Sequence, residues 1–333
     1  LNWTKLYADW LTRDLPRGGC ALSCDLPEHP ALYGEGWARA METLLPLGGA
    51  AQVQKMLRTL VEVSAEAQLA PGRIARSVSL GGRVTQVGGE RESAQLVALV
   101  HQTLLWSGDR AFAEDMLPVT GLCINYLRRT MRSFEDIQPD LVEDIRAALV
   151  GQTYILHLTG ADDTAIRTLI EKLPAQAEQS EENMTLAQQA MRCGEEAHIG
   201  RMIGKLGQMV HTAAPGLPGS IRTEDAAPGV LLQASAGYGL VRTVFNSLFG
   251  IRPDAGKKEI FWHPHTPIGW EGWQIENVKI GGDLFNVKSE RVSPSQARYT
   301  LTTDGQGWRV KTMENGEIKE TEVNGELSLV MED

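Results

Sequence analysis

The stretch YGLVRTVFNSLFGIRPDAGKKEIFW, residues 238–262, decides the fold because its hydrophobic spacing changes partway along. In the first half, the larger apolar residues recur at the spacing of one helix face: Tyr238, Val241, Phe245 and Leu248. Gly250 and Pro253 end this pattern, because glycine favours helix ends and proline cannot continue a helix. The next run, EIFW, is short and strand-like. We therefore expect helices before Pro253 and strands after it.

Upstream of this stretch, the sequence predicts amphipathic helices separated by turns that contain glycine and aspartate. One apolar stripe, for example, ends at Ser107-Gly108-Asp109, where the glycine forms the turn and the aspartate can cap the next helix. This reading gives about ten helices, near 2–13, 35–47, 50–67, 91–107, 110–133, 139–159, 162–178, 184–193, 195–211 and 230–249. Short connections predict antiparallel hairpins. The longer loops, 14–33, 70–90 and 212–229, are expected to carry function.

Downstream of Pro253, seven short runs have the composition of strands. They are EIFW, WQIENVKI, DLFNVKSERV, ARYTLTT, WRVKTM, IKETEV and LSLVM. Asp304-Gly305, Asn315-Gly316 and Asn324-Gly325 separate some of these runs, and such pairs are typical of hairpin turns. The sequence thus predicts a mainly α protein with a helical-hairpin domain at 1–252 and a small antiparallel β domain at 258–333.

Composition and charge restrict the partners of the chain. Its 333 residues carry a net charge of −10 and no cluster of Lys and Arg, which disfavours nucleic acid and anionic membranes as partners. No apolar run is long enough to span a membrane. The N-terminus lacks both a starting Met and the pattern of a signal peptide, so we interpret the chain as N-terminally incomplete. Four sparse cysteines favour a reducing, cytoplasmic location. We find no metal-ligand spacing and no cofactor motif, and expect neither.

Three segments resemble the six-hairpin glycosidases, whose helices form an (α/α)6 toroid. SIRTEDAAPGVLLQASAGYGLVRTVFNSLFGIRPDAGKKEIFWHPHTP is similar to the end of the toroid in α-L-rhamnosidases and glycogen-debranching-type amylo-α-1,6-glucosidases. These families place a catalytic carboxylate in a loop, then a last helix rich in small residues, then L-x-G-I-x-P-D, here Leu248 to Asp254. LPEHPALYGEGWARAMETLLPLGG resembles the start of an early inner helix, and EDMLPVTGLCINYLRRTM resembles a later helix. The resemblance implies a toroid-like helical domain that acts on a glycoside.

Glycoside hydrolysis with inversion needs two opposed carboxyl groups, roughly 6.5–9.5 Å apart. Glu224 precedes the last helix, where the resemblance places the base; the alternative is a surface-loop carboxylate that only caps or forms an ion pair. For the acid, Glu35 at a helix start is one candidate, although a charge favoured by the helix dipole is the alternative. Asp136, in a segment shorter than the acid-bearing loop of debranching-type relatives, is the other candidate. Glu28 is a rival of Glu35 on the same loop.

Several other residues are candidate substrate contacts. The ring of Trp37 could cover a sugar face. Glu90 and Glu92 open a helix and could hydrogen-bond sugar hydroxyls, or only cap that helix. Tyr238 on the last helix completes the predicted binding residues, together with Glu28.

The sequence therefore predicts a hydrolase that inverts a short α-linked glucoside or rhamnoside, with an oligosaccharide or glycoside as its partner. One alternative is a non-catalytic carbohydrate-binding or scaffold protein on the same fold. A phosphorylase, lyase or epimerase is another, because a fold by itself does not determine the reaction.

Overall fold

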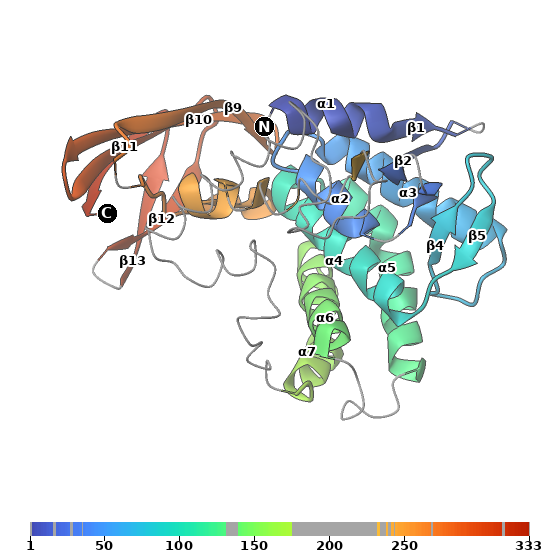
Figure 1. Ribbon diagram of the computed structural model, residues 1–333. Coiled ribbons are helices and arrows are strands. Elements are labelled where there is room, and N and C mark those ends of the chain that lie inside the picture. Colours follow the sequence, from blue (N-terminus) through green and yellow to red (C-terminus); the bar gives the residue numbers. More distant parts are fainter. Residues whose placement is uncertain are drawn as a thin grey trace.

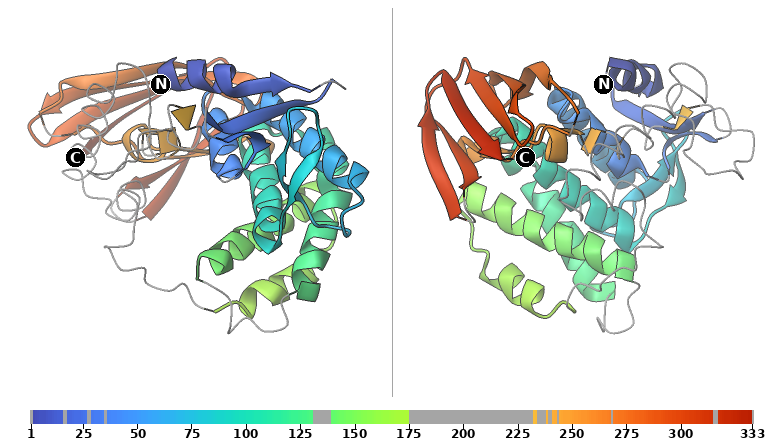
Figure 2. Two further views of the ribbon diagram at one scale, coloured as in Figure 1. Left: turned by 45° about the vertical axis from the view of Figure 1, so that its right-hand side comes forward. Right: turned by 60° about the vertical axis from the view of Figure 1, so that its left-hand side comes forward.

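The computed structural model describes residues 2–174 and 232–332, apart from gaps at 16–17, 27–28, 35, 131–138, 234–237, 239–240, 243, 268 and 315–316. The chain forms a helical part that carries a small sheet and, after it, a β-sandwich (Figure 1). Two further views also place the sandwich beside the helices (Figure 2). The change from helices to strands after Leu248 confirms the coarse fold class.

The helices follow the predicted ranges closely. They are α1 (Asn2–Leu11), α2 (Trp37–Leu44), α3 (Ala50–Glu66), α4 (Glu90–Ser107), α5 (Arg110–Thr130), α6 (Pro139–Thr159) and α7 (Thr164–Glu171). The boundary between α4 and α5 is the predicted one: Gly108 adopts φ 63°, and Asp109 Oδ1 accepts a hydrogen bond from Phe112 N at 3.0 Å. The expected helices 184–193 and 195–211 lie outside the described residues, so the closed toroid remains a prediction.

Helix α4 lies at the centre of the helical part. It packs against α2 and α6, and also against α3 and α5. Its inward residues are almost fully buried, including Leu96, Val100 and Leu104. Helices α2, α4 and α6 therefore form an inner row, while α3, α5 and α7 each follow an inner helix as its hairpin partner.

The region expected to be entirely helical also contains a sheet, which corrects the prediction for 14–33 and 70–90. Its strands are β1 (Thr12–Asp14), β2 (Cys20–Leu26), β3 (His29–Tyr33), β4 (Ala75–Val78) and β5 (Val84–Val87), which pair in that order. The sheet packs on α3, where Cys20 N donates to Thr59 Oγ1 at 3.1 Å and Ala75 N donates to Ser64 Oγ at 3.0 Å. The glycine and proline residues around these short runs are typical of loops, so the sequence predicted loops. The runs form strands because they pair with one another and pack on α3.

The prediction of a helix at 230–249 is also partly wrong. Leu232–Gln233 forms the short strand β6, which pairs with β2 through Asp25 and Gln233. Further along, Val244–Leu248 forms a π-helical turn with Phe245 and Leu248 buried. The beginning of this segment thus pairs with the edge of β2. Local hydrophobic spacing does not predict this contact, because the two strands are about 200 residues apart in the sequence.

The β-sandwich consists of two four-stranded sheets, in the orders β14-β11-β10-β9 and β13-β12-β8-β7. The strands are β7 (Ile251–Asp254), β8 (Glu259–Trp262), β9 (Gly272–Ile280), β10 (Asp283–Ser293), β11 (Gln296–Thr303), β12 (Trp308–Glu314), β13 (Glu317–Val323) and β14 (Glu326–Glu332). All pairs are antiparallel except β12 with β8, so the second sheet is mixed. Phe285, Tyr299 and Trp308 are fully buried between the sheets. Because β7 pairs with β8, the sandwich begins before the expected position 258.

Only one of the three predicted turns joins paired neighbours. Strands β12 and β13 pair across Asn315-Gly316, residues outside the described ranges, with Glu314 opposite Glu317. Asp304-Gly305 and Asn324-Gly325 instead connect strands of different sheets. Their side chains fix these crossings: Asp304 Oδ1 accepts from Leu284 N at 2.7 Å, and Asn324 Oδ1 accepts from Gly307 N at 2.8 Å. The hairpin prediction was wrong for these two turns because turn composition does not specify which strands pair.

Candidate active site

The starts of the three inner helices lie at one end of the helical part. Arg91, in the first turn of α4, forms an ion pair with Asp144 near the start of α6, with 3.4 Å between Nε and Oδ2. Before α2, Gly34 N donates to Arg76 O at 2.9 Å, and Arg76 Nε lies 3.8 Å from Glu92 Oε1 on α4. We call this end of the helical part, where α2, α4 and α6 start, the mouth.

The predicted catalytic carboxylates, Glu224, Glu35 and Asp136, and the predicted contact Glu28, all lie outside the described residues. Their roles therefore remain predictions. Glu35 directly follows Gly34, which contacts Arg76 at the helix starts described above, and Asp136 is three residues before Pro139, the first residue of α6.

Trp37 does not suit the predicted sugar-covering role. Its side chain is 1% exposed, and its ring meets Tyr33 edge-on with 6.2 Å between ring centroids. Gly36 precedes it with φ 77°, so α2 starts with a left-handed residue. The ring is therefore directed into the core, where no sugar can reach its face. Among the described residues, its Nε1 has no hydrogen-bond partner.

Glu92 performs the capping role that was the alternative to sugar binding. Its Oε2 accepts a hydrogen bond from Gly89 N at 2.7 Å, at the start of α4. A carboxylate at a helix start satisfies a free backbone N–H and interacts favourably with the helix dipole. Glu90 opens the same helix. Burial, followed by the charge of Glu90, raises the pKa of the Tyr126 phenol.

Glu42 on α2 meets Tyr238 and Arg242, two side chains from a segment about 200 residues further along the chain. Arg242 Nη1 donates to the hydroxyl of Tyr238. This hydroxyl lies 3.5 Å from Glu42 Oε1, and Arg242 Nη1 lies 3.8 Å from the same oxygen. The Glu42 side chain is 27% exposed and that of Arg242 is 39% exposed. The Glu42–Tyr238–Arg242 cluster is thus partly accessible to a ligand.

The environment of this cluster alters its proton affinities. Burial raises the pKa of Glu42 above its usual range, although Arg242, Tyr238 and Arg39 act in the opposite direction. Burial and the charge of Glu42 raise the pKa of Tyr238 to about 12. A carboxyl group that keeps its proton to higher pH can donate it to a leaving oxygen. The cluster combines such a carboxyl group with a phenol and a guanidinium that can bind sugar hydroxyls.

Tyr238 was predicted from the sequence, whereas Glu42 and Arg242 were not. Both lie on amphipathic segments next to buried residues, Met41 before Glu42 and Val241 before Arg242. The available signal was a charged residue beside an apolar stripe, in two of the three segments that carry the glycosidase resemblance. It was weak, because charged residues at the border of a stripe are usually solvent-exposed.

The described side chains include no group of three or more His, Cys, Asp and Glu that could hold a metal ion. Within the described ranges, no helix combines the length and apolar content needed to cross a membrane.

Comparison with known proteins identifies the fold. No protein-family model and no curated protein sequence matches the chain. Among solved structures, it matches the α-L-rhamnosidase of Streptomyces avermitilis complexed with L-rhamnose, with a TM-score of 0.64 and 12% identity over 99% of this chain and 41% of that one. It also matches α-L-rhamnosidase from Dictyoglumus thermophilum, with a TM-score of 0.66 and 10% identity over 100% of this chain and 49% of the other. The native enzyme of Aspergillus terreus gives 0.56 and 10% identity, over 89% of this chain and 45% of that one. The chain thus spans less than half of each neighbour and shares the fold of the corresponding part of α-L-rhamnosidases.

Proposed function

We propose that the chain belongs to a glycoside hydrolase that cleaves a short α-linked glucoside or rhamnoside with inversion. The observation that carries this proposal is the likeness of fold to α-L-rhamnosidases over 99% and 100% of the chain. The Glu42–Tyr238–Arg242 cluster adds a site with hydrogen-bonding groups suited to a sugar. Because fold alone does not define a reaction, the proposal depends on the carboxyl groups described next.

In the proposed reaction, Glu224 is the base that removes a proton from water while the water attacks the anomeric carbon. A second carboxyl group, on the opposite face of the sugar, gives its proton to the leaving oxygen. Glu35 and Asp136 are the candidates from the sequence. Glu42 is a third candidate, supported by its raised pKa and its partial exposure.

A non-catalytic carbohydrate-binding protein is the second candidate function. It is favoured by the structural roles of two predicted substrate contacts, the buried ring of Trp37 and the helix cap formed by Glu92. Both candidate functions use the same fold and bind a saccharide, and they differ in whether the glycosidic bond is cleaved.

The test measures hydrolysis of 4-nitrophenyl α-L-rhamnoside and 4-nitrophenyl α-D-glucoside, with the anomer of the product followed by NMR. We expect Glu224→Gln to lower kcat by about 10²–10⁴, the usual contribution of general acid–base groups. Glu326→Gln, at an exposed carboxyl group on β14, is the matched control and should keep full activity. If Glu224→Gln remains fully active, Glu224 is not the base. Sugar binding by the wild type without cleavage would favour the carbohydrate-binding protein.

The acid is identified from the pH profile. A carboxyl group with a raised pKa stays protonated to higher pH, so the rate falls as the pH rises through that pKa. Glu42→Gln should therefore lower kcat and remove this alkaline decline if Glu42 is the acid. An unchanged pH profile in Glu42→Gln would leave Glu35 and Asp136 as the candidates.

A further inference from the structure

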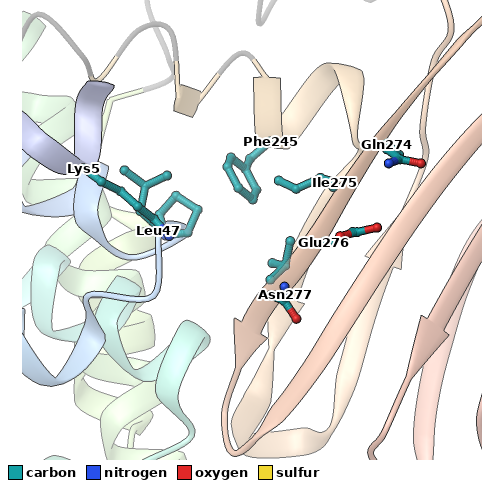
Figure 3. A pocket seen from close by; sticks show the side chains of 9 residues that line it. Lys5, Leu47, Phe245, Gln274, Ile275, Glu276 and Asn277 are labelled. Atoms are coloured by element: carbon teal, nitrogen blue, oxygen red, sulfur yellow. The ribbon is translucent and has the colours of Figure 1, made fainter. Parts of the chain in front are cut away.

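A cavity of about 400 Å³ lies where the helical part meets the β-sandwich. Lys5 from α1 and Pro46 and Leu47 after α2 form one wall, while Phe245 and the segment Gln274–Val278 of β9 form the other. Figure 3 shows Leu47 across the cavity from Phe245 and Ile275, with Asn277 at the edge. The volume is within the usual range of small-ligand pockets, roughly 300–1,000 Å³.

This cavity is separate from the helix starts at which the catalytic residues are expected. Leu47 follows the last residue of α2, whereas the mouth lies before its first residue, Trp37. The eight residues of α2 place its two ends about 12 Å apart, at a rise of roughly 1.5 Å per residue. None of the lining residues belongs to the Glu42–Tyr238–Arg242 cluster either, so a ligand in the cavity contacts a different set of side chains.

A β-bulge shapes the sandwich side of the cavity. Ile275 lies opposite Val287 and Val278 lies opposite Phe285, so Glu276 and Asn277 together face the single residue Asn286. Asn277 adopts φ 59°, and its backbone N–H donates to Asn286 Oδ1 at 2.8 Å. Asparagine adopts the left-handed region more readily than most residues, and the hydrogen bond to Asn286 fixes this conformation. The bulge therefore presents a preformed wall.

The lining also restricts the class of ligand. Strand β9 is at the edge of its sheet, and the left-handed Asn277 interrupts the regular ladder that an added peptide strand would need. An apolar ligand would cover Leu47, Phe245 and Ile275 but leave the amide of Asn277 and the ammonium of Lys5 without partners. A strongly anionic ligand would be attracted by Lys5 but repelled by Glu276. A neutral sugar ring presents apolar C–H faces and hydroxyl groups together, and so matches both parts of the lining.

We propose that this cavity between α1, the end of α2 and the bulge of β9 is a second saccharide site that binds one or two neutral sugar rings. The proposal takes its ligand class from the proposed function, but it requires no catalysis at the mouth. Two sites on one protein raise the effective concentration of a bound oligosaccharide at the other site.

The test uses L-rhamnose, D-glucose and maltose as probes, with affinities measured by calorimetry and by chemical shifts of the Asn277 side-chain amide. That signal is identified by its loss in Asn277→Gly, a change that keeps the left-handed backbone free of strain. We expect at least one probe to shift the signal of the Asn277 side-chain amide. The double variant Lys5→Ala/Asn277→Gly should bind that probe about tenfold more weakly, since each of the two side chains supplies one hydrogen bond.

The matched control is Lys172→Ala/Gln68→Gly, which changes an exposed lysine and an exposed residue with φ 54° elsewhere on the surface. It should bind like the wild type, and thermal melting shows whether each variant is folded. Equal affinity in all folded variants, or no shift at the Asn277 amide with any probe up to about 20 mM, a very weak affinity, would overturn the proposal. If Glu224→Gln loses turnover but still binds the probe in the cavity, the cavity is a site distinct from the catalytic site. Cavity binding by a wild type that hydrolyses nothing would reject only the proposed function.

Discussion

The contact between Tyr154 and Asp254 makes a sharp prediction about how the helical part and the sandwich are held together. Tyr154, on α6, donates a hydrogen bond of 2.6 Å to Asp254 Oδ1 at the end of β7. Lys257 Nζ binds the other carboxylate oxygen at 2.8 Å, and the Asp254 side chain is only 17% exposed. Burial and this hydrogen bond raise the pKa of the Tyr154 phenol. Tyr154→Phe removes the hydroxyl and keeps the ring that contacts His101.

The expected loss follows from the charge of the acceptor. A hydrogen bond to a charged group contributes about 1.5–3 kcal/mol to stability. Asp254 keeps its ion pair with Lys257 in the variant, so we expect a loss of about 2 kcal/mol, near the lower part of that range. For a protein of this size, the melting temperature should fall by roughly 3 °C. Other contacts across the junction remain, including the 2.7 Å hydrogen bond from Gly281 N to Trp106 O.

A double-mutant cycle tests this reasoning. Tyr154→Phe, Asp254→Ala and the double variant are compared by calorimetry, and the coupling energy isolates the contact between the two side chains because neither single variant keeps the hydrogen bond. We expect a coupling of about 1–2 kcal/mol. A coupling below about 0.5 kcal/mol, the usual limit of additivity, would refute the assignment of this contact as a stabilising one.

Two further predictions concern acid sensitivity and backbone geometry. Burial lowers the pKa of His101 to about 4, so the unfolded chain alone takes up this proton between its normal pKa and pH 4. Stability should fall by about 3 kcal/mol over that window as the pH decreases, and urea unfolding should show that His101→Phe removes this loss while His157→Gln, at an exposed histidine, keeps it. Gly250 has φ +64°, and an added Cβ would lie 2.1 Å from the backbone carbon of His263. Gly250→Ala should destabilise by more than about 3 kcal/mol, whereas Gly282→Ala, with nothing within 4 Å, should melt near the wild type; equal melting of the two would contradict this account.

The sequence by itself determined where the chain is helical and where it forms the sandwich. Hydrophobic spacing is a local property, so the stripe in α4 and the alternation in β11 could be read directly from residues a few positions apart. The turn at Gly108 and Asp109 was equally local, and the structure confirms it. The resemblance in the last helical segment indicated the same fold that the solved structures share.

Only the tertiary structure decided which segments meet. Glu42 and Tyr238 are 196 residues apart in the sequence, and no local pattern predicts that they share one cluster with Arg242. The burial of Trp37 and the crossing at Asp304-Gly305 have the same origin, because each depends on which surface a segment packs against. Propensity and spacing act over a few residues, whereas the free energy of burying a side chain or pairing a strand depends on partners that only the folded chain brings together.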